Sequence, residues 1–289
     1  KATLALAFAR ALLSLDAGDP ARAAGLVEQR KQPDLFWIEP ESGESSIRVE
    51  QARAALHALS LSPVEGRFRV AVINAAHLLT DSGQNAILKT LEEPNPAAVI
   101  VLVAPQAGAL LPTIVSRCQA LNLRPVSAVE IEQALLARGA EPSQARLLAR
   151  LARGRPGWAL RALADGELLS AREQRLADLR AVLAANRTDR FAYAETMSKA
   201  GPQAARVVLE EWLWYWRDVA RAASDPASPP AGALLNVDCA ESIAEVARRV
   251  SPAGATRATQ AILRAMAALE QNANPRLTFD ALLLQLPSV

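Results

Sequence analysis

The sequence is poor in cysteine, in charge of one sign and in long apolar runs. Its two cysteines, Cys118 and Cys239, are too few for a disulfide framework and lack the spacing of a metal site. A formal net charge of +2 excludes the dense positive field of a protein that grips nucleic acid alone, so contact with DNA would be shared with partners. No apolar run approaches a membrane span, and no secretion signal opens the chain. We therefore expect a cytoplasmic protein without membrane contact.

The first 125 residues alternate between the patterns of strands and helices. Two strands are predicted at 67–73 and 97–104, because the continuous apolar runs at 70–73 and 97–104 are typical of burial on both faces. Helices are predicted at 2–14, 46–59 and 81–93, the last of which ends before Pro94. Strands that alternate with helices in this way predict a parallel sheet covered by helices on both faces. The fold class is therefore α/β followed by all-α.

The rest of the chain shows helical patterns without strand signals. The helices are separated by short breaks at Pro142, 154–157, Asn186, Gly201 and Pro252, and a loop is predicted at 225–233. The sequence Ala-Asp-Gly at 164–166 interrupts the helical pattern and divides this half into two parts. We predict three domains: an α/β domain at 1–125, a small helical domain at 126–166 and a larger helical bundle at 167–289.

The end of the strand at 67–73 carries a chemical clue. In a sheet that hydrolyses nucleotides, such a strand ends in an Asp that holds magnesium, and a Glu follows that activates water. Here the strand ends in Asn74 and Ala75. An amide is a poor substitute for an anionic ligand and a methyl group cannot accept a proton, so both catalytic functions are missing. Taken alone, this pattern could also belong to an unrelated strand end.

Two longer patterns give that strand end a context. The first, at 78–94, includes a helix that ends in Leu-Glu-Glu-Pro, and the second, at 111–115, leads into Ser116, Arg117 and Cys118. In their order and spacing they resemble the clamp-loader subunits of bacterial DNA polymerase III, which are AAA+ proteins. In this family the tripeptide is the arginine-finger motif. The resemblance extends weakly to a lid motif at 154–160 and to the closing helix of a helical collar at 274–284.

The resemblance implies an architecture and a set of partners. Residues 1–125 would form a degenerate AAA+ domain, 126–166 a lid and 167–289 a collar for oligomerisation. The collar would assemble with homologous gamma or tau and delta-type subunits into a hetero-pentamer. That complex opens the sliding clamp and loads it on primer-template DNA during replication.

The ATP-site positions indicate which kind of subunit this is. Lys1 falls at the phosphate-loop lysine, but the hydroxyl residue expected next is replaced by Ala2. The sensing position after the second strand falls on Ala104 or Pro105, and Gly157 stands where the lid would carry a phosphate-sensing arginine. These losses fit the non-hydrolysing delta-prime type. Lys1 would bind nucleotide weakly at most, and the hydrolysed ATP would belong to a neighbouring subunit.

Arg117 is the part of the ATP machinery that survives. Its planar, permanently charged guanidinium suits the charge that develops on a transferring phosphoryl group. We therefore predict that Arg117, flanked by Ser116 and Cys118, acts in trans and that this chain alone is not an enzyme. The plainer interpretation is that Arg117 ends a helix and pairs with a local carboxylate. Two rival functions also remain: an active gamma- or tau-type ATPase, and a helical scaffold unrelated to ATPases.

Other chemically suggestive residues have plainer explanations. Trp212, Tyr215 and Trp216 share one helical face, which favours a place in the core over base stacking. Glu92 and Glu93 are adjacent on a helix and diverge by roughly 100°, so they do not predict a carboxylate pair. His57 and His77 are isolated, and we expect them to be structural. No activating base can be named for Cys118, so it does not predict a nucleophile.

Residues 15–32 depart from the family pattern because they contain no cysteine. Most delta-prime relatives carry a four-cysteine zinc module here. Either this lineage dispenses with the module, or residues between about Leu13 and Leu26 are missing. Lys1 also stands directly before a predicted helix without a start residue, so we expect the chain to be incomplete at its N-terminus. No cofactor is expected on the residues present, and structural zinc only if such a module exists.

Overall fold

The computed structural model describes residues 1–41, 44, 46–224, 234–271 and 273–288. The loop predicted at 225–233 lies outside them. The chain divides into two compact units, Lys1–Leu123 and Arg124–Val289. The first unit is α/β and the described residues of the second are helical, so the predicted fold class is confirmed.

The first unit is built on a parallel sheet of three strands in the order β1-β2-β3. Its strands are β1 (Leu35–Ile38), β2 (Arg69–Asn74) and β3 (Ala98–Val103). Leu35 pairs with Val70, and Arg69 pairs with Ala98. Two of these strands were predicted, whereas β1 was not. Four apolar residues carry no periodicity that distinguishes a short strand from a helical turn.

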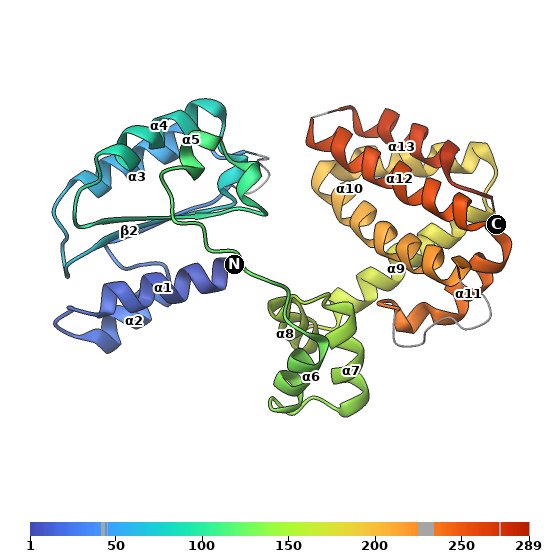
Figure 1. Cartoon of the computed structure of the whole chain (residues 1–289), viewed down its shortest axis with the longest axis horizontal. Helices are drawn as coiled ribbons and strands as arrows, with labels where there is room; N and C mark the ends of the chain where they lie inside the picture. Colours follow the sequence, from blue (N-terminus) through green and yellow to red (C-terminus); the bar gives the residue numbers. More distant parts are fainter. Residues whose placement is uncertain (42–43, 45, 225–233, 272, 289) are drawn as a thin grey trace. The chain divides into compact units, whose positions relative to one another are not determined.

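Helices cover both faces of this sheet, as predicted (Figure 1). They are α1 (Ala2–Ser14) and α2 (Pro20–Glu28) on one face, and α3 (Val49–Ser60) and α4 (Asp81–Glu92) on the other. Alternate residues of β2 serve the two faces: Val70 and Val72 pack with α1, while Ile73 packs with α3 and α4. This alternation is the ordinary geometry of a strand buried on both sides.

The prediction that β3 is buried was wrong. All six of its residues are only partly buried, whereas the first five residues of β2 are fully buried. Among the described residues β3 pairs with β2 alone and forms an edge of the sheet. A strand at an edge has neighbours on one side only, so the same apolar composition produces less burial there.

Short elements follow the strands of the first unit. They are the 3₁₀ turns η1 (Ala76–Leu78) and η2 (Ala107–Ala109), and the four-residue helix α5 (Pro112–Val115). The turn η1 begins after Ala75, which has a left-handed backbone with φ of 63°. A residue with a Cβ is uncommon in that conformation.

The regular elements in the described part of the second unit are all helices. The bounds are α6 (Ala128–Leu136), α7 (Pro142–Leu151), α8 (Pro156–Ala164), α9 (Glu167–Ala184), α10 (Arg187–Ser224), η3 (Val237–Cys239), α11 (Ala240–Arg249), α12 (Pro252–Glu270) and α13 (Pro275–Gln285). Pro142, Pro156 and Pro252 open helices, which is the position that tolerates a missing N–H. The break predicted at Gly201 is a kink inside α10, where φ is 87°.

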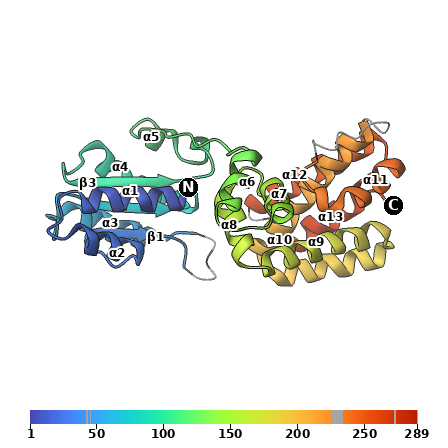
Figure 2. The same ribbon diagram turned by 90° about the horizontal axis from the view of Figure 1, so that it is seen from below.

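Two separate apolar clusters lie inside the second unit. One is formed by α6, α7 and α8 around Leu135 and Leu148. The other joins α9 to α13 around Trp212, Tyr215 and Trp216, whose side chains are 0% exposed. The predicted core role of these three aromatic residues is therefore confirmed. Figure 2 shows α10, α12 and α13 together in the larger bundle. The assignment of a lid and a collar to the two clusters stays a prediction.

Buried arginines form ion pairs within the second unit, and one of them joins the segment after α7 to α10. Arg172 of α9 pairs with Asp238 and donates to Asn236 at 2.6 Å. Arg153, which follows α7, pairs with Glu211 of α10 at 2.8 Å. The side chains of both arginines are 5% exposed or less. Burial lowers the pKa of Arg153, while the Glu211 carboxylate favours its charged form.

Candidate functional site

The carboxyl end of β2 is the place where the sequence lacks a magnesium ligand and a base. Asn74 lies there with its amide turned to a carboxylate of the neighbouring chain segment: Asn74 Nδ2 donates to Glu39 Oε2 at 3.3 Å. The sequence did not reveal Glu39. It follows β1, which was itself missed, and its nearness to Asn74 arises only from the pairing of the two strands.

Glu39 collects donors at this edge of the sheet. Trp37 Nε1 donates to it at 2.8 Å and Arg30 Nη1 at 2.7 Å, while the Arg30 guanidinium lies 4.3 Å from the centre of the Trp37 ring. The bond from Trp37, with smaller contributions from Asn74 and Arg30, lowers the pKa of Glu39. Glu39 is therefore an anion at neutral pH, and it already engages the amide of Asn74.

Lys1 and the end of β3 are brought together. Lys1 Nζ donates to the carbonyl oxygen of Ala104 at 2.7 Å and also to that of Pro105. The two positions proposed for the phosphate-loop lysine and for the sensor therefore meet. Both acceptors are backbone carbonyls, so this contact does not depend on a sensor side chain. A role of Lys1 in nucleotide binding stays a prediction.

Arg117 lies just after the short helix α5. Its Nη1 donates to the carbonyl oxygen of Thr113 at 3.0 Å and to Ser116 Oγ at 3.4 Å. Its Nη2 pairs with Glu92 Oε1 of α4 at 2.7 Å. The side chains of Arg117 and Glu92 are 38% and 51% exposed. The geometry of the plainer interpretation, a helix end and a local carboxylate, is therefore present, and the guanidinium also faces solvent.

The two residues beside Arg117 have modest roles of their own. Ser116 is the residue that ends α5, and its hydroxyl donates to Thr113 O at 3.0 Å. Cys118 is half-buried, and this burial raises the pKa of its thiol. A thiol that stays protonated at neutral pH is a packed side chain rather than a nucleophile.

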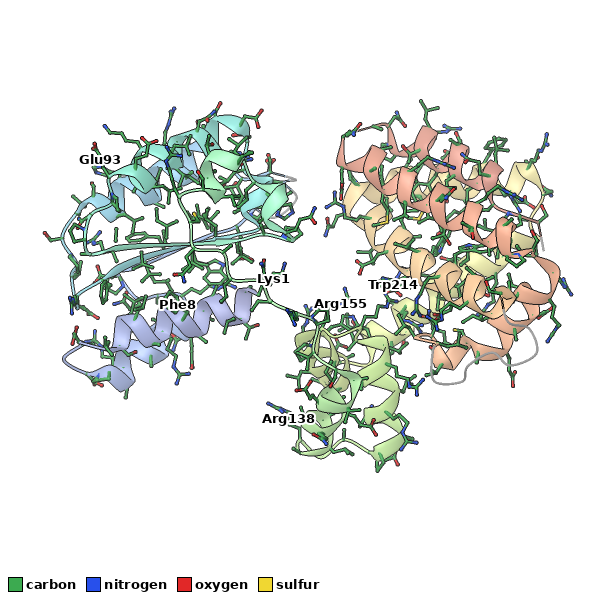
Figure 3. The ribbon with its side chains drawn as sticks, in the orientation of Figure 1. Lys1, Phe8, Glu93, Arg138, Arg155 and Trp214 are labelled. Atoms are coloured by element: carbon green, nitrogen blue, oxygen red, sulfur yellow. The ribbon has the colours of Figure 1, made fainter. Side chains whose placement is uncertain are left out.

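The position that would carry a lid arginine behaves like an ordinary helix start. Gly157 is exposed in the first turn of α8. The nearby Arg155 pairs with Glu210 of α10 at 2.9 Å, within the second unit. Figure 3 labels Arg155 and also Trp214 of α10, whose ring lies 5.0 Å from the Arg153 guanidinium. Both arginines of this segment thus have partners on α10.

Metal ligands do not gather anywhere in the described part of the chain: it holds no group of three or more His, Cys, Asp or Glu side chains suited to a metal ion. Residues Leu13 to Leu26 lead from α1 into α2, where Asp19 caps the helix by accepting from Arg22 N at 3.0 Å. A zinc module, and a segment missing from this stretch, stay predictions.

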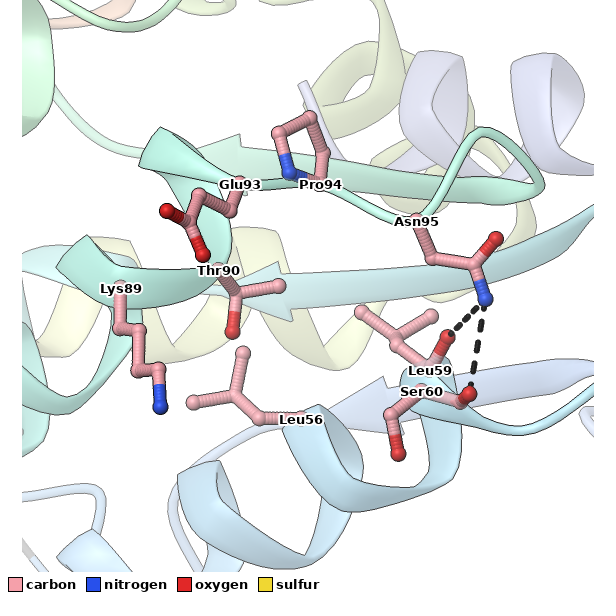
Figure 4. Close-up of a pocket in the computed structure, with 8 residues that line it drawn as sticks. All are labelled: Leu56, Leu59, Ser60, Lys89, Thr90, Glu93, Pro94 and Asn95. Carbon is pink, nitrogen blue, oxygen red and sulfur yellow. Dashed lines mark hydrogen bonds between the residues drawn. The ribbon is translucent and has the colours of Figure 1, made fainter.

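A pocket of about 290 Å³ lies between α3 and α4, away from the residues predicted from the sequence. Leu56 and Leu59 form part of its wall, and Lys89 and Glu93 contribute opposite charges (Figure 4). Asn95 Nδ2 donates to the carbonyl oxygens of Leu59 and Ser60, each at 3.5 Å. The Asn95 amide therefore fixes the backbone at the C-terminal end of α3.

None of the helices in the described residues combines the length and the hydrophobicity that crossing a bilayer requires.

Family models match both ends of the chain. The family described as "DNA polymerase III, delta subunit" matches residues 1–127, and the one described as "DNA polymerase III, delta subunit, C terminal" matches residues 166–287. Together these two stretches make up most of the 289 residues. They include Arg117, Asn74 and the helices α9 to α13.

Curated relatives agree with the family models. The chain is 33% identical to the DNA polymerase III subunit delta' of Bacillus subtilis over 155 residues, which is 52% of this chain and 46% of the relative. It is 37% identical to the delta' subunit of Pseudomonas aeruginosa, over 53% of this chain and 46% of that protein. The delta' subunit of Escherichia coli is 36% identical over the same shares. The matches thus span about half the length of these relatives.

The comparisons also include a solved structure and a tau subunit. The DNA polymerase III gamma subunit-related protein of Thermotoga maritima is 18% identical, covers 93% of this chain and 90% of its own, and has a TM-score of 0.37. The subunit tau of Escherichia coli is 34% identical over 44% of this chain. The two family models together with the curated delta' relatives support a delta-prime clamp-loader subunit of DNA polymerase III.

Proposed function

We propose that this chain is a non-hydrolysing clamp-loader subunit that supplies Arg117 in trans to the ATP site of a neighbouring subunit. The observation that carries the proposal is a contrast within the first unit. The strand end at Asn74 holds an amide bound to Glu39, where hydrolysis requires an anionic magnesium ligand. The guanidinium of Arg117, by contrast, is charged, part-exposed and held at the surface.

The chemistry of a finger suits this arrangement. In phosphoryl transfer the protein contributes position and charge, and an arginine given in trans neutralises the oxygens of the transferring group. Arg117 would contribute to a neighbour's transition state, while Ser116 and Cys118 shape the end of α5 beneath it. The ATP would belong to that neighbour.

The partners follow from the family. We propose assembly with gamma or tau and delta-type subunits into a hetero-pentamer through residues 167–289, with 126–166 as the lid and 1–125 as the degenerate nucleotide-binding domain. The complex would act in the cytoplasm and would contact the sliding clamp and primer-template DNA together. The similarity to delta', gamma and tau subunits supports these partners.

The main test removes the finger from the assembled complex. The Arg117→Ala variant of the full-length protein is reconstituted with the ATPase subunits, the clamp and primed DNA, and ATP turnover is measured. We expect turnover at the neighbouring site to fall by about 10³- to 10⁵-fold. Arg10→Ala is the matched control, because Arg10 is a surface arginine of the same unit that pairs with Glu28 at 2.7 Å. Unchanged turnover in Arg117→Ala would exclude the finger.

A second test separates this proposal from an active gamma- or tau-type ATPase. The isolated full-length chain is incubated with ATP and magnesium, and released phosphate is measured. We expect no turnover above the rate without protein, because Asn74 and Ala75 provide neither an anionic metal ligand nor a base. Hydrolysis that depends on magnesium would favour the rival.

A further inference from the structure

The ion pair between Arg117 and Glu92 joins two elements that are far apart in the sequence. Glu92 is the last residue of α4, and Arg117 follows the C-terminal end of α5. The two side chains meet at 2.7 Å, and the carbonyl oxygen of Thr113 accepts from the same guanidinium at 3.0 Å. An otherwise flexible side chain is therefore fixed from two directions.

The position of Glu92 is unfavourable for α4 itself. The C-terminal end of a helix carries partial negative charge, so an acidic side chain in the last turn opposes the helix dipole. Lys89 is the residue of that turn with the favourable sign. The partner that compensates Glu92 lies on another element, since its carboxylate reaches Arg117. The favourable interaction of Glu92 is therefore the one with Arg117, and not one that stabilises α4.

The pair leaves part of the guanidinium available. Arginine has five N–H donors in a planar fork. Thr113 O and Ser116 Oγ accept from Nη1, and the Glu92 carboxylate forms an ion pair with Nη2. Within the described residues, Nε–H donates no hydrogen bond, and Nη2 has only the ion pair with Glu92. Two N–H groups on a guanidinium can bind two phosphate oxygens together, so Glu92 holds Arg117 without occupying all of it.

We infer that Glu92 is a positioning residue for Arg117: it holds the guanidinium in the orientation from which it reaches a neighbour's phosphoryl group. The inference rests on the proposed finger role. A side chain that is already ordered loses less rotamer freedom when it enters the transition state. An exposed pair is weak, so the expected loss of kcat in Glu92→Ala is about two- to five-fold, with KM for ATP unchanged.

The experiment measures kcat and KM for ATP in the reconstituted complex of full-length subunits. The variants are Glu92→Ala, Glu92→Gln, Arg117→Ala and the double variant of both alanines. Glu92→Gln keeps an acceptor and is expected to retain more activity than Glu92→Ala. Glu93→Gln is the matched control, because Glu93 is the neighbouring acid but lines the pocket beside α3. Thermal unfolding of each variant checks that it folds.

The double variant identifies the route by which Glu92 acts. If Glu92 works through Arg117, Glu92→Ala lowers kcat in the native background and has no further effect when Arg117 is already alanine. An equal loss in both backgrounds would assign Glu92 a structural role and overturn the inference. A rise of kcat in Glu92→Ala would also overturn it, since Glu92 would then restrain Arg117.

The two proposals can fail separately. If Arg117→Ala leaves turnover unchanged, the finger role fails, and with it the basis for Glu92. If Arg117→Ala lowers turnover as expected while Glu92→Ala leaves kcat unchanged, the finger stands and the positioning role of Glu92 is excluded.

Discussion

The arginines of the two units are held in different ways. Arg117 in the first unit pairs with Glu92 at the surface, where the two side chains are 38% and 51% exposed. Arg172 in the second unit is 3% exposed and pairs with Asp238 and Glu211, and it also donates to Asn236. Ion pairs of similar length thus differ in interaction energy, because water screens the first pair and is excluded from the guanidinium of the second. The buried arginine serves the structure, while the exposed one is available to a partner.

The largest expected effect comes from breaking the buried network. Arg172→Ala leaves the buried Asn236 Oδ1 without its donor, and it leaves Glu211 with Arg153 as its remaining cation in a region of low dielectric. We expect the free energy of unfolding of the second unit to fall by about 3–5 kcal/mol. Chemical denaturation of the full chain, followed by tryptophan fluorescence, measures this loss. Arg146→Ala is the control, because Arg146 is 70% exposed and pairs with Glu132, and it should cost less than about 0.5 kcal/mol.

Gly154 provides the next largest test, at the point where the chain after α7 passes Pro125. Its φ is +76°, and an added Cβ would lie 2.9 Å from Pro125 Cα. The strain of a left-handed alanine and the overlap with Pro125 predict that Gly154→Ala lowers the free energy of unfolding by about 2–4 kcal/mol. In Gly157→Ala, where no atom lies within 4 Å of the added Cβ, we expect no loss and a gain of at most about 1 kcal/mol. Equal stability of both variants would contradict this account.

Arg117→Ala should have a small effect on stability, in contrast to its proposed effect on turnover. The loss of one exposed ion pair predicts a decrease of about 1 kcal/mol or less in the free energy of unfolding. Thermal denaturation of the isolated chain measures it. A decrease above about 2 kcal/mol would place Arg117 with the structural arginines and would undermine the contrast between the two units.

The smallest expected effect is the loss of stability when Glu39 is protonated at acid pH. Its pKa is lowered in the folded protein, so the native state binds fewer protons than the unfolded chain as pH falls past the usual value of 4.5. The stabilisation is fully present above that pH and is lost as pH falls through the folded pKa. The NMR signal of the Trp37 indole N–H should therefore titrate below pH 4.5. In Trp37→Phe, Glu39 should titrate closer to its ordinary pKa, and an unchanged value would contradict the role of the Trp37 bond.

Local sequence rules predicted most of the regular structure. Helix α1 has the expected bounds, 2–14, and α4 ends at Glu92, one residue before its expected end. Proline and glycine signals work well because their effect is local: Pro142 and Pro252 open helices, and Gly201 kinks α10. The strand β1 was missed because four apolar residues have too little periodicity.

The contacts at the site were less predictable. Adjacent Glu92 and Glu93 were expected only not to pair with each other, and the local carboxylate considered for Arg117 had no residue number; the structure identifies it as Glu92, across the contact of α4 with α5. Glu39 was not a candidate, because its contact with Asn74 requires the pairing of β1 with β2. No pattern within either segment reports such a neighbour.

The sequence by itself determined the α/β character of the first unit, the helices of the second, and the absence of an acid at Asn74, since these depend on residue types and local periodicity. It also carried the motifs that led to the family. Only the tertiary structure decided the partial burial of β3, the burial of Arg172 and the partner of Arg117. Burial and ion pairing depend on which segments meet in space, and helix packing and strand pairing set those meetings over distances that local patterns do not encode.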